Sequence, residues 1–388
     1  MKKIIIVNNN MEIGGVQKSL YNLLWNIHDR YDVTLCLFRA EGSYMDQLPS
    51  DVKIVACKGL FRYLGISQGE CAGVHKLIRG ALALTAKLFG RNVAMKLVLA
   101  GEKTVPGYYD CAISYLQNGN IKNFYGGVQE FILKKVRADK KIAFLHCDYS
   151  NCGANHPVNN RLIGKFDQIA ACSDGCRRAF EQVLPELREK CVSVRNFHRF
   201  DEIRQLASRE PVVYEGLGPH VLMVSRLAHE KGIERAIRAA AKVRDAGLSI
   251  MLRIVGSGPM ESMLRELTQK TGMTDCVVFH GQQENPYRYM ANADLFLMTS
   301  FHEAAPMVID EAASLGLPVL TVRTTSSHEM VVERGNGWIC ENDQDALNVA
   351  LVDILRDPGA LGAVKNRRNS RPADNETAME QFAVMIEG

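Results

Sequence analysis

Two series of short apolar segments, each alternating with helical stretches, constrain the fold of this 388-residue chain more than any other feature. The first series opens with residues 4–7, an unbroken run of Ile and Val that is typical of a parallel strand covered on both faces. A polar loop and a helical run at 18–27 follow it, which together indicate a βα unit. Further strands are predicted at 33–38, 52–55, 111–115, 141–145 and 168–172. The first half is therefore predicted to be a doubly wound α/β domain.

The second series begins after a break in this pattern. A strand at 192–194 is followed by a polar, helix-like stretch at 196–209 and by a Gly- and Pro-bearing segment that ends at Pro219. Strands are then predicted at 221–224, 249–255, 277–279, 295–298 and 318–321. Because the chain exceeds the length at which one core usually keeps growing, we expect two domains, at 1–195 and 196–370. Within the remaining segment, 371–388, an amphipathic helix at 378–386 is expected to pack back on the N-terminal domain.

The cysteines and the N-terminus indicate the compartment. Eleven cysteines are an odd number, they are irregularly spaced and no CxxC pair occurs, which favours reduced thiols over a disulfide framework. The tightest group of metal-binding residue types is His146, Cys147, Cys152 and His156, but its spacing matches no standard zinc finger. The chain also passes from Met1 almost directly into a strand, and no apolar run approaches the roughly 20 residues of a membrane span. We therefore expect a cytoplasmic protein without a signal peptide.

The charge pattern leaves two interpretations of one segment. The net charge of +4 is too small to indicate nucleic acid binding, and we expect no nucleic acid partner. Residues 72–101 include no acidic residue, and basic and apolar residues interleave at 75–99. This pattern is typical of a basic amphipathic helix on an anionic membrane surface, here the inner face of the cell membrane. It is equally typical of one or two helices that cover the N-terminal sheet and expose a basic face to water.

Three segments could bind a phosphate group. Ser225, Arg226 and Lys231 follow the strand that ends at residue 224, and open α/β sheets bind ligands at the carboxyl ends of their strands. A turn with Gly256, Gly258 and Pro259 follows the next strand, and such turns allow the backbone to approach a phosphate closely. The pair Gly14 and Gly15 follows the first strand, with a helix starting near residue 16.

The segment 300–316 has the most specific pattern. A helix is predicted just after Pro306, so that Glu303 lies in the preceding loop and Glu311 projects from the second helical turn. The backbone N–H groups of Met307 and Val308 would then form an anion site at the helix N-terminus. Carboxylates and free N–H groups would therefore gather at one end of a parallel sheet.

This segment resembles the E-x7-E motif of the GT-B retaining glycosyltransferases of family 4, with Glu303 and Glu311 as its two glutamates. The resemblance extends over nearly the whole chain and is weakest at about 49–105. It implies the GT-B fold, two Rossmann-like doubly wound α/β domains that face each other across a cleft. Further matching segments are Gly14-Gly15-x-Gln17, Ser225-Arg226-Leu227 with Lys231-Gly232, Gly256-x-Gly258-Pro259, His280-Gly281, Asn285-Pro286-Tyr287 and Ala293-Asp294-Leu295.

The resemblance assigns roles to these residues. It implies that Arg226 and Lys231 bind the diphosphate of a nucleotide-sugar donor and that Glu303 hydrogen-bonds the transferred sugar. Glu311 would bind the ribose, and the N–H groups of residues 307 and 308 would meet sugar or phosphate oxygens. His146, just after the strand at 141–145, resembles the family's cleft histidine, which helps to position donor sugar and acceptor. The family usually has Gly-Phe after its first glutamate, whereas residues 304–305 here are both Ala.

The resemblance also implies the reaction. Such enzymes retain anomeric configuration, and the leaving phosphate itself helps to deprotonate the acceptor. We expect a UDP-sugar donor, a lipid-linked glycan acceptor in the synthesis of capsule, O-antigen or exopolysaccharide, no cofactor and no metal. The one Asp-x-Asp, at Asp343 and Asp345, precedes a predicted helix and is interpreted as an N-cap. The alternatives are a non-catalytic scaffold of the same fold and, within catalysis, a nucleotide-sugar epimerase or a phosphorylase.

Overall fold

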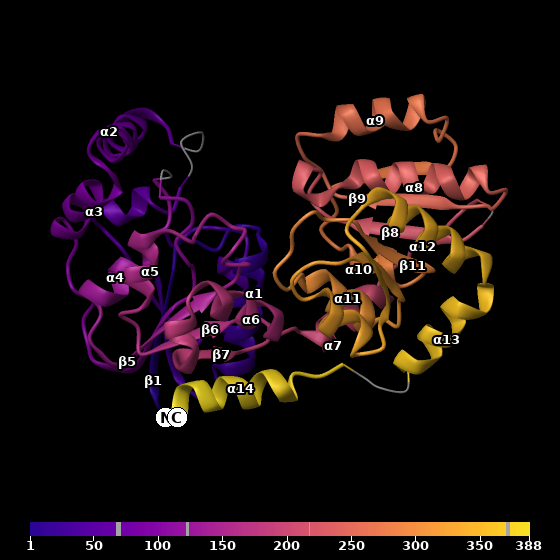
Figure 1. Ribbon diagram of the computed structural model, residues 1–388. Helices are drawn as coiled ribbons and strands as arrows, with labels where there is room; N and C mark the ends of the chain where they lie inside the picture. The colour runs from indigo at the N-terminus through magenta and orange to yellow at the C-terminus, as the bar shows by residue number, and fades with distance from the viewer. Residues whose placement is uncertain (67–70, 122–123, 217, 370–372) are drawn as a thin grey trace. The chain divides into compact units, whose positions relative to one another are not determined.

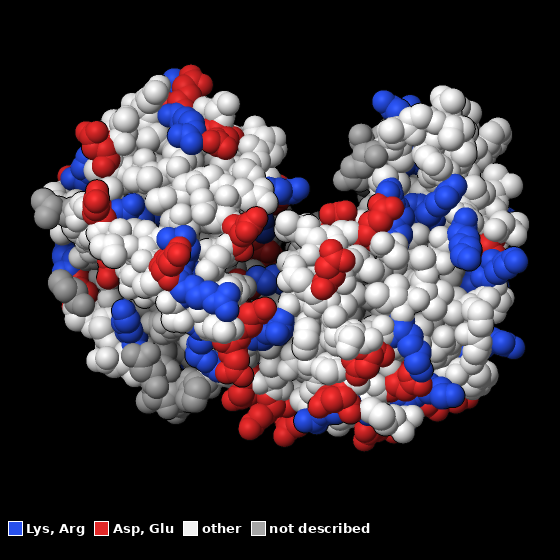
Figure 2. Space-filling view, turned by 180° about the vertical axis from the view of Figure 1, so that it is seen from behind, with Lys and Arg blue, Asp and Glu red and all other residues white. Residues whose placement is uncertain are grey.

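The computed structural model describes residues 1–66, 71–121, 124–216, 218–369 and 373–388, and the chain divides into two compact units (Figure 1). The first unit comprises Met1–His198 and Asn375–Gly388, and the second comprises Arg199–Asp374. Each unit is a parallel sheet with helices, so the prediction of two doubly wound α/β domains is confirmed. The start of the predicted segment 371–388 lies outside the described residues. On the face shown in Figure 2, acidic and basic side chains are interspersed over both units, which agrees with the small net charge.

The first unit is built on a seven-stranded parallel sheet with the order β3-β2-β1-β4-β5-β6-β7. The direction of winding reverses between β1 and β4, and ligand crevices of open α/β sheets form at such points. β1 is buried because its Ile and Val side chains pack on both faces of the sheet. The strands are β1 (Lys3–Asn8), β2 (Asp32–Leu37), β3 (Lys53–Ala56), β4 (Tyr109–Ser114), β5 (Ala138–Leu145), β6 (Gln168–Ala171) and β7 (Cys191–Ser193).

The helices of the first unit start where local signals place them. α6 begins after Ser173, whose side-chain oxygen accepts the N–H of Cys176, and α5 begins at Pro157. The α-helices are α1 (Gly15–Ile27), α2 (Gly73–Phe89), α3 (Arg91–Ala100), α4 (Val128–Lys135), α5 (Pro157–Ile163), α6 (Asp174–Val183) and α14 (Glu376–Glu387). Short 3₁₀ helices are η1 (Met45–Gln47), η2 (Leu60–Tyr63) and η3 (Pro185–Lys190).

The C-terminal helix α14 packs on the first unit. Phe382 is fully buried, with its ring centroid 5.9 Å from that of Tyr31 and 6.0 Å from that of Phe197. Lys2 Nζ donates to the carbonyl of Ile386 at 3.1 Å, so the two chain ends lie together, as Figure 1 shows. The apolar side of this amphipathic helix therefore completes the core of the first unit.

The basic segment 75–99 forms the two helices α2 and α3, but its basic residues have different surroundings. Arg79 is buried and its Nε donates to the carbonyl of Ile66 at 2.8 Å, while buried Arg91 pairs with Glu130 at 2.6 Å. These two arginines belong to the interior, so the expectation that they form part of a basic outer face is wrong. The outer face carries exposed lysines and apolar residues, namely Lys76, Lys87, Lys96, Val74, Leu77, Leu84, Leu88, Phe89, Val93 and Leu97.

The second unit has a six-stranded parallel sheet with the order β10-β9-β8-β11-β12-β13, and its winding reverses between β8 and β11. Alternate residues of β8 point to opposite faces, so that Val221 and Met223 enter one core cluster and Leu222 the other. The strands are β8 (His220–Val224), β9 (Met251–Val255), β10 (Val277–Gly281), β11 (Leu295–Met298), β12 (Val319–Val322) and β13 (Gly337–Cys340). The last of these was not predicted.

The helices of the second unit include the one expected after Pro306, since α11 begins at Met307. The side chain of Asp343 accepts the N–H of Ala346 at 2.8 Å and caps α12, as predicted from the Asp-x-Asp. The helices are α7 (Phe200–Ser208), α8 (Ile233–Asp245), α9 (Glu261–Lys270), α10 (Tyr287–Met290), α11 (Met307–Ser314), α12 (Gln344–Arg356) and α13 (Pro358–Asn369), with the 3₁₀ helix η4 (His229–Lys231) and the π-helix η5 (His328–Val332). None of the helices within the described ranges is long and apolar enough to cross a bilayer.

Candidate functional site

The loop that follows β8 is anchored to the loop that follows β9. The N–H of Ser225 donates to the carbonyl of Val255 at 3.0 Å, and the N–H of Leu227 donates to the carbonyl of Ser257 at 2.9 Å. The turn glycines permit this contact. A Cβ on Gly256, at φ +139°, would lie 1.9 Å from the carbonyl oxygen of Ser225, and one on Gly258 would lie 2.4 Å from that of Leu227.

Packing of the two loops alone therefore explains why residues 256 and 258 are glycines. They were predicted to let the backbone approach a phosphate, but the group that approaches them is the backbone of the loop that carries Arg226 and Lys231. Pro259, which follows them, is exposed. The turn at 256–259 thus holds the neighbouring loop in place.

An ion pair joins the segment that follows β8 to the segment that follows β11. Lys231 Nζ lies 2.6 Å from Glu303 Oε1, and these side chains are 27% and 15% exposed. The hydroxyl of Thr299 donates to the carbonyl of Gly232 at 2.8 Å, and a Cβ on Gly232, at φ +58°, would lie 2.4 Å from the Thr299 carbonyl oxygen. The backbone thus fixes where the two charged side chains meet.

Arg226 is the outermost charge of this site. Its guanidinium pairs with Glu230, and the Arg226 side chain is 68% exposed. The hydrogen bond from Arg226 lowers the pKa of the Glu230 carboxyl below its usual value. The Ser225 hydroxyl, in contrast, is buried and has no hydrogen-bond partner among the described residues.

Helix α11 begins shortly after Glu303 in the chain and offers N–H groups at its start. Pro306 is extended, with ψ 114°, and the helix begins at the next residue, Met307. The N–H groups of Met307 and Val308 lie in the first turn of the helix, where no carbonyl one turn earlier can accept them. Glu311 is buried in the second turn, with 4% of its surface exposed. The structure thus brings Lys231 and Glu303 into contact within one unit, and α11 begins shortly after Glu303 in the chain.

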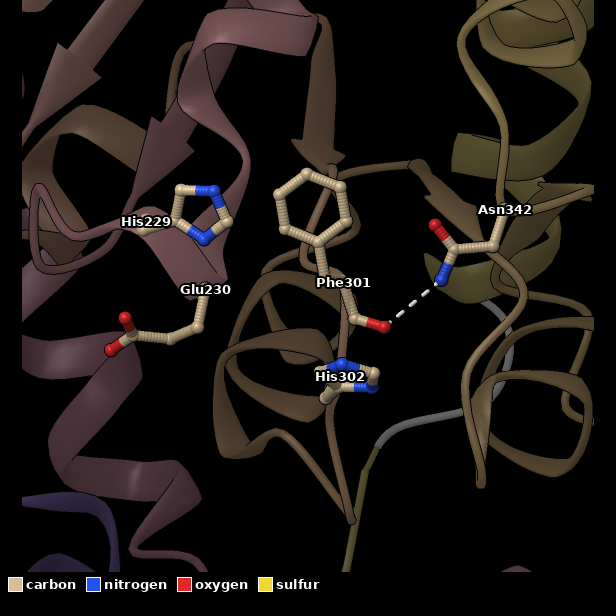
Figure 3. Close-up of a pocket in the computed structure, with 5 residues that line it drawn as sticks. All are labelled: His229, Glu230, Phe301, His302 and Asn342. Atoms are coloured by element: carbon tan, nitrogen blue, oxygen red, sulfur yellow. Dashed lines mark hydrogen bonds between the residues drawn. The ribbon is translucent and has the colours of Figure 1, made fainter. Parts of the chain in front are cut away.

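A pocket of about 460 Å³ opens beside these segments, lined by His229, Glu230, Phe301, His302 and Asn342 (Figure 3). The rings of His229 and Phe301 stack at 5.2 Å, and the amide of Asn342 donates to the carbonyl of Phe301 at 3.1 Å. The sequence interpretation named no residue of this pocket as a site residue. The sequence could have identified four of these residues, because 229–230 and 301–302 directly precede Lys231 and Glu303.

His146 of the first unit lies at the end of β5 among aromatic rings. Its ring stacks on Phe144 with centroids 4.6 Å apart, and the ring of Tyr115 is 4.5 Å away. The backbone N–H of His146 donates to Gln117 Oε1 at 3.1 Å, whereas the ring Nε2 is buried without a partner among the described residues. Burial lowers the pKa of His146 from 6.5 to about 3, so the imidazole is neutral near pH 7.

The two glycines after β1 differ in their surroundings, since a Cβ on Gly14 would lie 2.6 Å from Gln17 Oε1. Gly14 is extended, Gly15 is the first residue of α1, and no atom lies within 4 Å of a Cβ built on Gly15. Near them, Gln17 Nε2 donates to Asn10 Oδ1 at 3.2 Å, and Asn10 Nδ2 donates to the carbonyl of Gly65 at 2.8 Å. Neutral amides thus hydrogen-bond to one another near the start of α1, and open space lies beside Gly15.

The group His146, Cys147, Cys152 and His156 is not assembled as a metal centre. Within the described ranges, no three His, Cys, Asp or Glu side chains are arranged to hold a metal ion. His156 instead caps α5, because its Nδ1 accepts the N–H of Val158 at 3.2 Å.

Solved structures define the class of fold. The chain is similar to Anabaena Alr3699/HepE in complex with UDP, at 17% identity, a TM-score of 0.69 and full coverage of both chains. It is also similar to WaaG, a glycosyltransferase involved in lipopolysaccharide biosynthesis, at 16% identity, a TM-score of 0.62 and coverage of 99% of this chain and 100% of that chain. The fold is that of the GT-B glycosyltransferases, as predicted.

A family match lies within the second unit. Residues 209–373 match the family described as Glycosyl transferases group 1. The putative colanic acid biosynthesis glycosyltransferase WcaL of Salmonella typhimurium is 29% identical over 170 residues, 41% of this chain and 42% of that protein. The amylovoran biosynthesis glycosyltransferase AmsK of Erwinia amylovora is 31% identical over 143 residues, 34% of this chain and 35% of that protein. The chain thus spans about two fifths of the length of the curated relatives it matches.

Proposed function

We propose that this chain is a glycosyltransferase that moves a sugar from a nucleotide-sugar donor, preferably a UDP-sugar, onto a glycan acceptor. The observation that carries the proposal is the ion pair of Lys231 and Glu303 beside the start of α11. This arrangement combines positive charge for a diphosphate with a carboxylate for sugar hydroxyls. The UDP and UDP-glucose complexes of Anabaena Alr3699/HepE support the choice of donor.

The leaving group explains why the site needs these residues. Negative charge grows on the diphosphate as the glycosidic bond breaks, and preorganised cations and N–H donors stabilise it. Arg226 and Lys231 supply the cations, and the first N–H groups of α11 supply donors. Glu303 accepts hydrogen bonds from sugar hydroxyls, and Glu311 from the ribose. A bound diphosphate would compete for Lys231 and leave Glu303 able to accept from the sugar.

The mechanism that we propose retains anomeric configuration and needs no metal ion. The leaving phosphate takes the proton of the acceptor hydroxyl on the same face, and neutral His146 hydrogen-bonds the reacting groups through its buried Nε2. Asp343 caps α12, in agreement with the interpretation of the Asp-x-Asp as an N-cap. An NMR spectrum of the glycosylated product would test retention, since an inverted anomeric linkage would contradict it.

For the acceptor, we propose a lipid-linked glycan of surface polysaccharide synthesis. The printed functions of WcaL and AmsK, colanic acid and amylovoran biosynthesis, support this choice. So does the outer face of α2 and α3, where Leu77, Leu88 and Phe89 are 65–74% exposed beside exposed Lys87. Apolar side chains among lysines suit an anionic membrane surface, which would hold a cytoplasmic protein near its lipid-linked substrate.

The first experiment measures thermal stability with UDP, GDP, ADP or no nucleotide, each with and without EDTA. A ligand at 100 times its Kd stabilises the native state by about 2.7 kcal/mol, which raises Tm by several degrees. We expect UDP to give the largest rise and EDTA to leave it unchanged. No rise with any nucleotide would favour the scaffold alternative, and loss of the rise with EDTA would contradict metal independence.

The second experiment separates the transferase from its alternatives. Glu303→Gln keeps the size of the side chain and removes its charge, so we expect sugar transfer to fall on the order of 10²-fold or more. Glu266→Gln, an exposed surface change in α9, is the matched control. A scaffold would show no transfer that Glu303→Gln could reduce. An epimerase would convert the nucleotide sugar in the absence of an acceptor.

The membrane part is tested separately with vesicles that contain anionic lipid. We expect co-sedimentation at low salt that weakens as salt rises, and less binding by Lys76→Glu/Lys87→Glu. Lys242→Glu, on the second unit, is the control. No binding of the wild-type chain at low salt would overturn the membrane part and favour a soluble acceptor.

A further inference from the structure

Two cysteines of the first unit face each other at the end of β5. Cys147 Sγ and Cys152 Sγ are 2.9 Å apart. The loop between them is closed by Asp148, whose carbonyl accepts the N–H of Cys152 at 3.0 Å and whose carboxylate accepts the N–H of Ser150 at 3.0 Å. A disulfide has a sulfur–sulfur distance near 2.05 Å, so these sulfurs need to approach by about 0.9 Å. The backbone turn has thus already paired the two thiols.

The two thiols differ in access to solvent. Cys152 is exposed and Cys147 is half-buried, so a reagent in solution reaches Cys152 first. When one thiol of the pair ionises, the hydrogen bond from Cys147 lowers the pKa of Cys152, and the same contact with burial raises the pKa of Cys147. Cys152 therefore has the features of an attacking thiol and Cys147 those of a resolving one.

We propose that Cys147 and Cys152 form a redox-active dithiol, a modification site that closes to a disulfide by exchange with a low-molecular-weight disulfide. The Cys152 thiolate attacks one sulfur of the reagent, whose S–S bond breaks and releases one thiolate. The Cys147 thiol then loses its proton to water and its sulfur attacks Cys152, which releases the second thiolate. The two cysteines lose two electrons, and the reagent gains them as two thiols.

The position of the pair couples it to the candidate histidine. Cys147 directly follows His146, whose ring stacks on Phe144 and whose backbone N–H donates to Gln117. Shortening the sulfur–sulfur distance requires rotation of the Cys147 or Cys152 side chain or a shift of its backbone. The ring orientation of His146 changes if Cys147 moves, so oxidation should also lower the proposed transfer activity, an effect that rests on the proposed function.

The test treats the pure full-length chain with glutathione disulfide, followed by denaturation, alkylation and mass spectrometry. We expect two fewer of the eleven thiols to react with the alkylating reagent, with a peptide in which Cys147 and Cys152 are joined. Dithiothreitol should restore both thiols. If all eleven thiols stay free, or if the oxidised pair does not involve 147 and 152, the proposal is overturned.

Single variants test the order of attack. Cys147→Ser should hold glutathione as a mixed disulfide on Cys152, because no second thiol can release it. Cys152→Ser should react more slowly and accumulate less mixed disulfide on Cys147. Cys276→Ser, a half-buried thiol of the second unit, is the control and should form the 147–152 disulfide like the wild type. Equal trapping on both single variants would contradict the assigned roles.

An activity assay tests the coupling to His146 and can fail independently. We expect oxidation to lower transfer severalfold, dithiothreitol to restore it, and Cys147→Ala/Cys152→Ala to be insensitive to both reagents. A disulfide that forms without any change in transfer would overturn the coupling. The mass spectrometric result does not depend on transferase activity, so the redox-active dithiol can be confirmed or contradicted independently of the proposed function.

Discussion

The loops after β1 and after β8 follow the central strands of two similar sheets, yet they are built from different groups. In the second unit, the loop carries charge, with Arg226 bound to Glu230 and Lys231 bound to Glu303. In the first unit, the corresponding loop has no Lys or Arg at residues 9–14, its one charged residue is the exposed Glu12, and neutral amides, among them Asn10 and Gln17, hydrogen-bond at the start of α1. Charged groups suit a nucleoside diphosphate, whereas amides suit the hydroxyl groups of a neutral glycan.

The glycines of the two loops differ in the same way. Gly256, Gly258 and Gly232 each face a carbonyl oxygen that leaves no room for a Cβ, so the second unit uses glycine to pack its own loops. Gly15 faces open space, and Gly14 is extended and near only the flexible side chain of Gln17. A glycine-rich turn after a strand can therefore either pack two loops together or leave open space for a ligand. Only the atoms around each glycine distinguish these two roles. The following predictions test this difference.

The largest effect is expected for Lys231→Met. The change removes the cation nearest to Glu303 and leaves that carboxylate, 15% exposed, without its ion-pair partner. We expect kcat/KM for transfer to fall on the order of 10²–10³-fold, the range seen when one group that stabilises developing charge is lost. Lys242→Met, an exposed lysine of α8, is the control and should leave kcat/KM unchanged. Transfer kinetics at saturating acceptor would measure this change. An unchanged kcat/KM for Lys231→Met would show that the charged loop is not part of the site.

Local signals explain which parts of this site could be predicted from the sequence. Pro306 followed by an apolar, small-residue run fixed the start of α11, because helix boundaries depend on a few neighbouring residues. The contact of Lys231 with Glu303 spans 72 residues and depends on β8 and β11 being neighbours in the sheet, which no local pattern reveals. β13 was missed because its four half-buried residues lie at the sheet edge between polar neighbours.

Charge patterns predicted the surroundings of side chains less well than local signals predicted helix boundaries, as the basic segment 75–99 illustrates. Arg79 and Arg91 lie on the predicted basic stretch, but carbonyl groups and Glu130 bind them in the interior. Their depth depends on which side of each helix faces the sheet. The sequence gives only the helical period of a stretch that contains both apolar and basic residues on several sides. The E-x7-E spacing, in contrast, is independent of how α11 packs.

The next effect in size is on stability, from Gly256→Ala. The new Cβ would lie 1.9 Å from the Ser225 carbonyl oxygen, at a φ of +139° that side chains rarely adopt. We expect the free energy of unfolding to fall by about 3 kcal/mol, since backbone strain and the displaced loop add. Urea unfolding measures it. Gly247→Ala, at φ +76° with nothing within 4 Å, isolates the strain alone and should cost about 1 kcal/mol. Equal costs would show that the loop contact has no role.

The pH dependence of stability tests the buried histidine of the first unit. Burial lowers the pKa of His146 from 6.5 to about 3, so the unfolded chain binds one more proton than the folded chain between these values. Stability from this group is fully present above pH 6.5 and is lost as pH falls towards 3, with a slope of up to about 1.4 kcal/mol per pH unit. Urea unfolding of His146→Gln should show a shallower fall than the wild type. His302→Gln, at an exposed site of the second unit, is the control, and equal slopes for all three chains would contradict burial of His146.

The smallest effect, and the one with the opposite sign, is expected for Gly15→Ala. Gly15 is helical and a Cβ there meets no atom within 4 Å, so Ala should raise the free energy of unfolding by about 0.5–1 kcal/mol by restricting the unfolded chain. The added methyl group would at the same time enter the open space at the start of α1. If that space receives the acceptor, the KM for acceptor rises while the chain becomes more stable, a combination that a purely structural glycine would not produce. Urea unfolding and acceptor titration of the same variant measure both quantities. A loss of stability would mean that the first unit, like the second, needs its glycine for packing, and the contrast between the two loops would no longer hold.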